Sequence, residues 1–169
     1  MKNIGVSLLL FVFGHTLQSY GQTAQQLYKE GVTKVAVRNY KGAIDYLNQS
    51  IQLDPDNVSA YKYRGFAQNA LGRYAEAIQD FNKVLESNTK DAETYDYRGS
   101  AKFAVGDYKG AIQDYSKVLE FKPNDEATYY GRGISKIELG DVEGGCLDVR
   151  KASELGYLKA RNMLDKYCN

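Results

Sequence analysis

Three arginines and three aspartates recur in this sequence at a constant spacing, and they are its charged groups best placed for specific chemistry. Successive members of each set are 34 residues apart: Arg64, Arg98 and Arg132, and Asp80, Asp114 and Asp148. A row of guanidinium groups suits an acidic ligand, whereas an arginine that faces an aspartate forms a charge-assisted ion pair. One period upstream both residue types are missing, and Glu30 and Tyr46 stand in their places. Because the two types appear and disappear together, and an unpaired buried charge is costly, we favour a repeated Arg–Asp pair between neighbouring helices.

The two cysteines of the chain, Cys146 and Cys168, form a second candidate pair. Residues 155–157 are expected to form a turn, and residues 159–167 a helix with one apolar face. If this helix runs antiparallel to the one that carries Cys146, the two cysteines lie close together, and in an oxidising compartment they form a structural disulfide. Two buried free thiols are the alternative. The pair lacks the CxxC spacing, which disfavours a redox-active role.

The first 21 residues have the features of a Sec signal peptide. Lys2 precedes an apolar run over residues 4–13, and small residues around Gly21 predict cleavage before Gln22. A membrane anchor is the alternative, but spanning a bilayer takes about 20 apolar residues. A lipoprotein is disfavoured because no cysteine follows the run directly. We therefore expect an exported protein, periplasmic or secreted, with no membrane insertion after cleavage.

The processed chain offers few groups for catalysis. Its only histidine, His15, lies in the predicted signal peptide, and the sequence contains no tryptophan. This excludes histidine bases and histidine-ligated metals. Asp54, Asp56 and Asn57 lie close together but lack the glycine and the terminal glutamate of a calcium loop, so helix capping is favoured. Without Lys2, acidic and basic residues balance at 21 each, which argues against a nucleic-acid partner. We expect no catalytic residue, metal or cofactor.

These residues are carried by an internal repeat. The segments that begin at Tyr61, Tyr95 and Tyr129 are similar and lie 34 residues apart. Apolar and small residues recur within them at helical spacing, and Gly72, Gly106 and Gly140 fall where a helix is expected to end and the chain to reverse. A fixed period of this length is typical of a solenoid of stacked units, which binds other molecules along its surface.

The repeat resembles the tetratricopeptide repeat. We number positions within four units, 24–57, 58–91, 92–125 and 126–159. Position 8 carries a small residue and position 20 an alanine in the first three units, at Gly31, Gly65 and Gly99 and at Ala43, Ala77 and Ala111. Pro55 and Pro123 fall near the ends of units. The resemblance implies an all-α fold: a helix–turn–helix solenoid of four repeats in a single domain over residues 22–169, closed by a capping helix at about 159–168.

The resemblance also implies where a ligand binds. In this family positions 2, 5, 9, 12 and 13 of each first helix face a concave groove. The expected groove residues, with Lys62 exposed to solvent, are Tyr28, Val32, Lys62, Phe66, Asn69, Asp96, Phe103, Tyr130 and Ile134, and the same positions include Val35, Ser59 and Glu93. Family members that hold chaperone C-termini use a Lys/Asn/Arg clamp for the terminal carboxylate. This chain departs from that pattern, because Tyr28 and Val32 stand where the first unit would need Lys and Asn.

We therefore expect a non-enzymatic scaffold of the bacterial envelope that binds a protein or peptide segment in its concave groove. Two alternatives remain: a structural subunit of a larger envelope or secretion assembly, and an enzyme, which the missing histidine and the uninterrupted repeat disfavour. Phe66, Phe103 and Ile134 could instead pack between neighbouring helices. The oligomeric state and the identity of the partner stay open.

Overall fold

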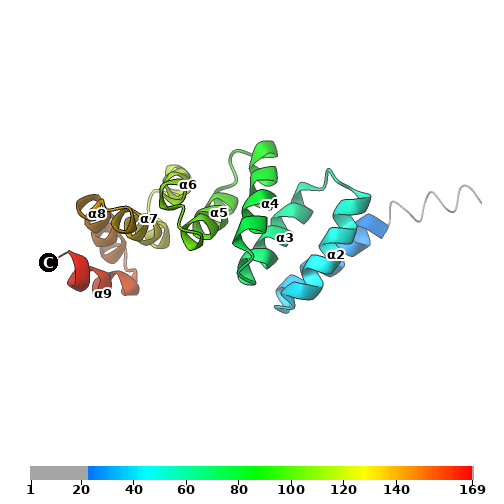
Figure 1. Ribbon diagram of the computed structural model, residues 1–169, viewed down its shortest axis with the longest axis horizontal. Coiled ribbons are helices and arrows are strands. Elements are labelled where there is room, and N and C mark those ends of the chain that lie inside the picture. The colour runs from blue at the N-terminus through cyan, green and yellow to red at the C-terminus, as the bar shows by residue number, and fades with distance from the viewer. Residues whose placement is uncertain (1–22, 169) are drawn as a thin grey trace, which may run out of the picture.

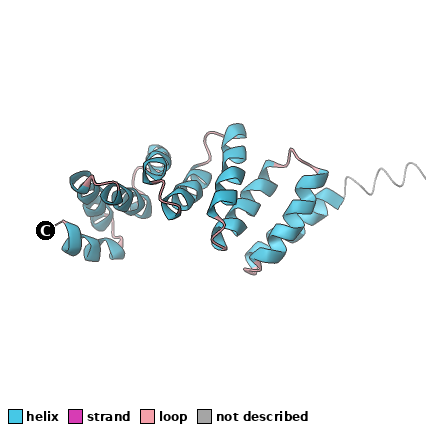
Figure 2. Ribbon diagram, in the orientation of Figure 1, coloured by secondary structure: helices cyan, strands magenta, loops and turns pink. Residues whose placement is uncertain are grey.

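A computed structural model describes residues 23–168 of the chain. Every regular element in this range is a helix (Figure 2), as the sequence predicted. A first helix covers residues 23–36. The others, in chain order, are α2 (Tyr40–Leu53), α3 (Val58–Ala70), α4 (Tyr74–Ser87), α5 (Ala92–Ala104), α6 (Tyr108–Phe121), α7 (Glu126–Glu138), α8 (Val142–Glu154) and α9 (Leu158–Tyr167). The predicted signal peptide lies outside the described residues.

The helices form antiparallel pairs, one pair for each 34-residue unit, that stack along the long axis of the molecule. The series runs from the first helix and α2 at one end to α7, α8 and α9 at the other (Figure 1). Each helix has its main contacts with its neighbours in the chain, as in the α7–α8 pair and between α6 and α7. This is the solenoid that the sequence predicted.

Side-chain caps explain where most helices begin. Asn39, Asn57, Asp91, Asp107 and Asp125 each accept a hydrogen bond from the backbone N–H three residues on. Such a bond satisfies a helical N–H group that would otherwise lack a partner, and is worth about 1 kcal/mol. The α4 helix starts after Arg73 without a side-chain cap.

Left-handed residues end the first helix of each pair. Gly72, Gly106 and Gly140 have φ angles of 75°, 82° and 94°, which glycine adopts without a Cβ penalty. In unit one the same turn is made by Arg38 at φ 59°, an uncommon conformation for a residue with a side chain.

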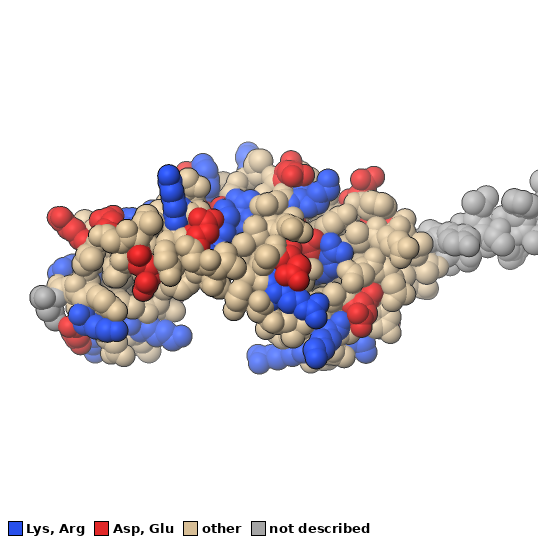
Figure 3. Space-filling view, viewed as in Figure 1, with Lys and Arg blue, Asp and Glu red and all other residues tan. Residues whose placement is uncertain are grey.

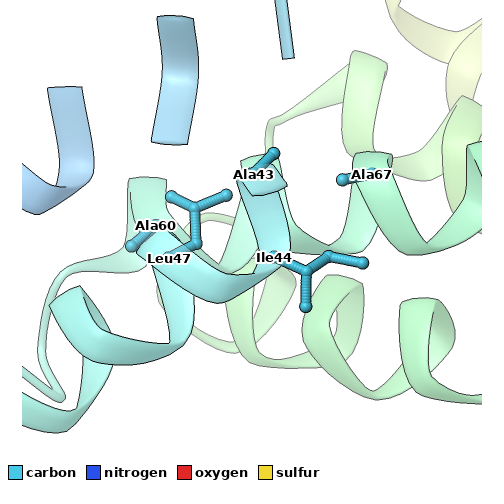
Figure 4. Packing of buried hydrophobic residues seen from close by; sticks show 5 residues of the cluster. All are labelled: Ala43, Ile44, Leu47, Ala60 and Ala67. Atoms are coloured by element: carbon cyan, nitrogen blue, oxygen red, sulfur yellow. The ribbon is translucent and has the colours of Figure 1, made fainter. Parts of the chain in front are cut away.

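Alanine and glycine let the paired helices approach closely. Ala43, Ala77 and Ala111 are fully buried, and a Cβ added at Gly65 would lie 2.8 Å from Cε1 of Phe81. Figure 4 shows the core between α2 and α3, where Ala43, Ile44 and Leu47 lie near Ala60 and Ala67. Because Leu47 and Phe81 are fully buried, truncating either to alanine is expected to cost about 2–5 kcal/mol.

The turn between α8 and α9 differs from the turns between the earlier units. The C-cap residues that follow α2, α4 and α6 have φ between −138° and −131°: Asp54, Asn88 and Lys122. The α8 helix ends instead in a turn with Gly156 at φ 101°, where the N–H of Tyr157 donates to the carbonyl of Ala152 over 2.9 Å. The turns inside the pairs make the same bond, for example from Asp107 to Lys102.

Candidate functional site

The first helices of units one to three form a groove on the concave side of the solenoid. Its volume is about 360 Å³. We call this the concave groove, and its lining residues come from the first helix, α3 and α5: Tyr28, Val35, Ser59, Lys62, Tyr63, Phe66, Glu93 and Tyr97. In the view of Figure 3, the lower edge of the molecule is hollowed below α5 and α6 of Figure 1.

Aromatic side chains make most of the apolar wall. The rings of Tyr28 and Tyr63 meet edge to face with centroids 6.0 Å apart, and those of Phe66 and Tyr97 at 5.1 Å. Phe66 also packs on Tyr40, at 6.1 Å. Edge-to-face pairs are favourable arrangements worth about 0.5–1.5 kcal/mol each. The groove therefore has a wall that is already organised before any ligand arrives.

An ionic network lies at one side of the groove. Nζ of Lys62 is 2.9 Å from Oδ2 of Asp91 and 2.7 Å from Oε2 of Glu93, and the Tyr97 hydroxyl donates to Glu93 over 2.9 Å. The hydrogen bond from Lys62 lowers the pKa of Glu93. Burial, followed by the bond to Glu93, raises the pKa of Tyr97 well above its usual value. All these charges are already paired inside the protein.

Three of the nine expected groove residues, Tyr28, Lys62 and Phe66, line the concave groove. Lys62 is not solvent-exposed as we expected, because only 25% of its side chain is accessible and two carboxylates hold it. The other six are half-buried elsewhere: Val32, Asn69, Asp96, Phe103, Tyr130 and Ile134.

Two of these six pack on rings of the protein itself. Phe103 lies 5.4 Å from the ring of Tyr108, and Tyr130 lies 4.9 Å from the ring of Tyr157. Phe103 thus contacts the second helix of its own unit, and Tyr130 contacts the residue that precedes α9.

Sequence reasoning missed Tyr63 and Tyr97, which occupy position 6 of units two and three. Both lie directly after an expected groove position and one period apart. The recurrence of a tyrosine at position 6 was the available signal. It could not be used because the family pattern assigns the groove to other positions.

A second constellation lies between the paired helices of units two, three and four. Arg64, Arg98 and Arg132 each donate two hydrogen bonds, from Nε and Nη2, to Asp80, Asp114 and Asp148, at 2.6–2.8 Å. The structure thus brings together each arginine and the aspartate expected for it. We call these six residues the charge ladder. Its carboxylates are nearly inaccessible, and its arginine side chains are 16–20% exposed.

Each rung of the charge ladder also reaches beyond its own unit. Nη1 of Arg64 donates to Asn48, and Nη1 of Arg98 donates to Asn82, at 2.8 and 2.7 Å. Arg132 makes the corresponding contact with Ser116 at 3.3 Å. Each guanidinium group lies 5.3–5.5 Å from a tyrosine ring three residues upstream. Each of the three nitrogen atoms of every guanidinium group therefore donates a hydrogen bond within the protein, which disfavours the ladder as a site for an external acidic ligand.

The structure also brings Cys146 and Cys168 together. Their Cα atoms are 5.6 Å apart and their sulfur atoms are bonded, which links α8 to the end of α9. In residues 23–168 no group of three or more metal-ligating side chains is found, and none of the helices in that range is long and apolar enough to cross a membrane.

Solenoids of helix pairs with a concave groove form a class of proteins that bind other molecules. Two sequence profiles of one family match the chain: "Tetratricopeptide repeat" over residues 28–92 and "TPR repeat" over residues 99–140. The chain is a tetratricopeptide repeat protein.

Solved structures have the same fold. MamA from Desulfovibrio magneticus RS-1 is 19% identical with a TM-score of 0.74, over 78% of this chain and 75% of that one. A tetratricopeptide repeat protein from Parabacteroides merdae is 23% identical with a TM-score of 0.72, over 83% and 57%. At such identities the likeness shows the fold alone. No protein with a curated function matches the chain at a significant level.

A third structure carries a ligand. The first repeat domain of Spaghetti (RPAP3), bound to the HSP90 peptide SRMEEVD, is 28% identical with a TM-score of 0.65. The match covers 70% of this chain and 94% of that domain.

Proposed function

We propose that this protein is a non-enzymatic scaffold that holds a peptide segment of a partner protein in the concave groove. The observation that carries the proposal is the groove itself, about 360 Å³ in volume and lined from three consecutive units by aromatic side chains. Exposed aromatic residues in such grooves are frequent anchors of binding energy. The structure of the RPAP3 domain with a peptide supports the same mode of use for this fold.

We propose that the ligand of the concave groove is not an acidic C-terminus. The concave groove contains one basic residue, Lys62, and it is already bonded to Asp91 and Glu93. Among the described residues that line the groove, none offers a free cation to receive a terminal carboxylate. An apolar or aromatic anchor fits the wall formed by Tyr28, Tyr63 and Phe66.

We also propose that the chain acts after export, in the periplasm or outside the cell. The support is the sequence before residue 22, where Lys2 precedes an apolar run and small residues. N-terminal sequencing of the protein from an envelope fraction tests this, and Gln22 is the expected first residue. A cytosolic protein that retains Met1 would contradict it.

The groove is tested by affinity capture from envelope extract, with Tyr28→Ala as the variant. Tyr28 lines the groove at the edge of its aromatic wall, so its loss is expected to weaken capture about 30-fold, as for an interface anchor worth about 2 kcal/mol. Tyr167→Ala is the matched control, because Tyr167 is an exposed tyrosine on α9. Equal capture by both variants and wild type would show that the partner binds elsewhere.

A second candidate, a structural subunit of an envelope assembly, is favoured by apolar side chains at the C-terminal end. Leu158 is 87% exposed and Leu147 64% exposed. Leu158→Asp and Leu147→Asp would abolish assembly under this function and leave peptide binding intact under the first.

A further inference from the structure

Along the concave side, the first helix of each unit packs beside the first helix of the next unit. We compare the charged residues at two of these helix–helix contacts. Between α3 and α5, Lys62 at position 5 of its unit bonds to two carboxylates at the start of α5. These are Asp91, which caps α5 by accepting the N–H of Thr94 over 3.0 Å, and Glu93 on the first turn of α5. A basic side chain therefore neutralises the acidic start of α5.

The next helix–helix contact, between α5 and α7, has the same aspartate cap but a negative instead of a positive charge at position 5. Asp125 caps α7 by accepting the N–H of Thr128 over 2.9 Å, as Asp91 does for α5. Asp96 lies one period after Lys62, and Ala127 lies one period after Glu93. The negative charge of Asp125 therefore acts on a second carboxylate here, that of Asp96.

Asp96 has no partner of its own within residues 23–168: it is half-buried and makes no hydrogen bond or ion pair there. Burial raises its pKa, and the charges of Asp125 and Glu93 raise it further against the opposing effect of Lys122. A carboxylate in these surroundings is stabilised by a cation brought close to it. At the equivalent place one unit earlier, the protein supplies that cation itself.

Asp96 also lies beside the concave groove. Glu93 and Tyr97, which lie on α5 before and after Asp96 in the chain, both line the groove. We propose that Asp96 and Asp125 bind the basic side chain of a lysine or arginine in the peptide that the concave groove holds. The inference rests on the function proposed above and names the chemistry of its ligand.

The geometry sets the spacing of the recognised residues. Neighbouring helices pack about 8–10 Å apart, so the aromatic wall and the Asp96–Asp125 pair are about 10–15 Å apart. An extended peptide advances about 3.3 Å per residue. The basic residue therefore lies about three to five residues from the large apolar residue that enters the groove.

The proposal is tested with a display library of random ten-residue peptides. The library is selected for binding to the full-length protein in the form that is purified from cells. Peptides selected by the wild type are expected to carry a lysine or arginine three to five residues from an aromatic or large aliphatic residue. A synthetic peptide of that sequence should bind Asp96→Asn at least about 10-fold more weakly. Its Lys→Gln counterpart should bind both proteins equally, which isolates the Lys–Asp96 pair.

Two further variants sharpen the result. Asp96→Glu retains the charge and should retain the preference. Asp96→Lys reproduces the arrangement of Lys62 and should lose the preference for basic peptides, because its own ammonium group occupies the place beside Asp125.

The remaining outcomes separate the two proposals. Selected peptides that need Tyr28 but show no basic residue, or an acidic one, would overturn the Asp96 site and leave groove binding intact. The same conclusion follows if calcium chloride or spermidine alone binds at Asp96 in calorimetry while peptides show no charge preference. Peptides that bind equally to wild type and Tyr28→Ala, or the absence of any selected peptide, would overturn both proposals.

Discussion

The charge ladder and the helix–helix contacts of the concave side repeat with the same period, but the ladder keeps its residue types from unit to unit and the concave side does not. The ladder presents one arginine, one aspartate and one stacked tyrosine in each of three units, with nearly identical distances. Position 5 on the concave side changes from unit to unit, as Tyr28, Lys62, Asp96 and Tyr130. Contacts that recur hold the stack together, and positions that vary are free to define a ligand.

Breaking a rung is expected to have the largest effect. Arg98→Ala leaves Asp114, which is 2% exposed, with Lys102 as its remaining ion-pair partner. Removing one member of a buried pair costs about 3–5 kcal/mol. Urea unfolding should show this loss, whereas the exposed Arg150→Ala is expected to stay within about 0.5 kcal/mol.

A comparison of rungs refines that result. Asp148, like Asp114, has a second basic partner, Lys136, at 2.7 Å. Within residues 23–168 Asp80 has Arg64 as its only ion-pair partner, and Gln68 stands at the position that corresponds to Lys136. Arg64→Ala should therefore destabilise the protein more than Arg98→Ala. Midpoints equal to wild type for both would return the arginines to the role of a binding site for an acidic ligand.

Loss of the disulfide at the C-terminal end of the stack is expected to have the next largest effect on stability. The Cys146–Cys168 link spans 22 residues, and a bond that closes such a loop stabilises by about 3 kcal/mol in the chain-entropy model. Cys168→Ser should lower the melting temperature of oxidised protein and leave reduced protein unchanged. Two free thiols in denatured, unreduced material from the periplasm would refute the link.

Lys62→Ala should have a smaller effect than either, although the side chain bonds two carboxylates. Ion pairs near the surface contribute about 1 kcal/mol or less. The loss in urea should thus be well below that of Arg98→Ala. A loss as large as for a rung would mean that the concave side is as structural as the ladder.

Asp96→Asn should have the smallest effect, and in the opposite direction. The pKa of Asp96 is raised in the folded protein, by burial and then by Asp125 and Glu93 against Lys122. Its favourable contribution is therefore present below the unfolded pKa of about 3.9 and is lost as the pH rises through the folded pKa. Unfolding in urea at pH 4 and pH 7 should show that the variant gains stability over wild type with rising pH. An unchanged difference would show that Asp96 is not disfavoured in the free protein.

The repeating features of the fold were predictable from the sequence because they are local and periodic. Glycine at 72, 106 and 140, capping residues such as Asn57 and Asp91, and small residues at helix crossings each encode one turn or one contact. The partnership of Arg98 and Asp114 followed from their joint occurrence. The first turn was less predictable, since Arg38 takes the left-handed conformation that the other units assign to glycine.

The candidate site was only partly predictable because it depends on contacts between units. Nothing local to Lys62 indicates that Asp91 and Glu93, about 30 residues downstream, will bury and neutralise it. Tyr63 and Tyr97 line a groove to which three neighbouring units contribute, so their role could not be read from the sequence of one unit. Phe103 and Tyr130 were also expected on the concave side, and the sequence did not indicate that their rings pack on Tyr108 and Tyr157.

The turn at Gly156 has a consequence for how the molecule can grow. A repeat array that ends on an open apolar face can add another molecule head to tail and polymerise into a fibre. Here the chain turns back as it does inside a pair, and Ala160, Met163 and Leu164 of α9 cover Val149 and Tyr129 of the last unit. The covalent link from Cys168 to α8 then keeps α9 in that position. Helix α9 thereby covers apolar residues of the last unit on which a further helix pair could otherwise stack.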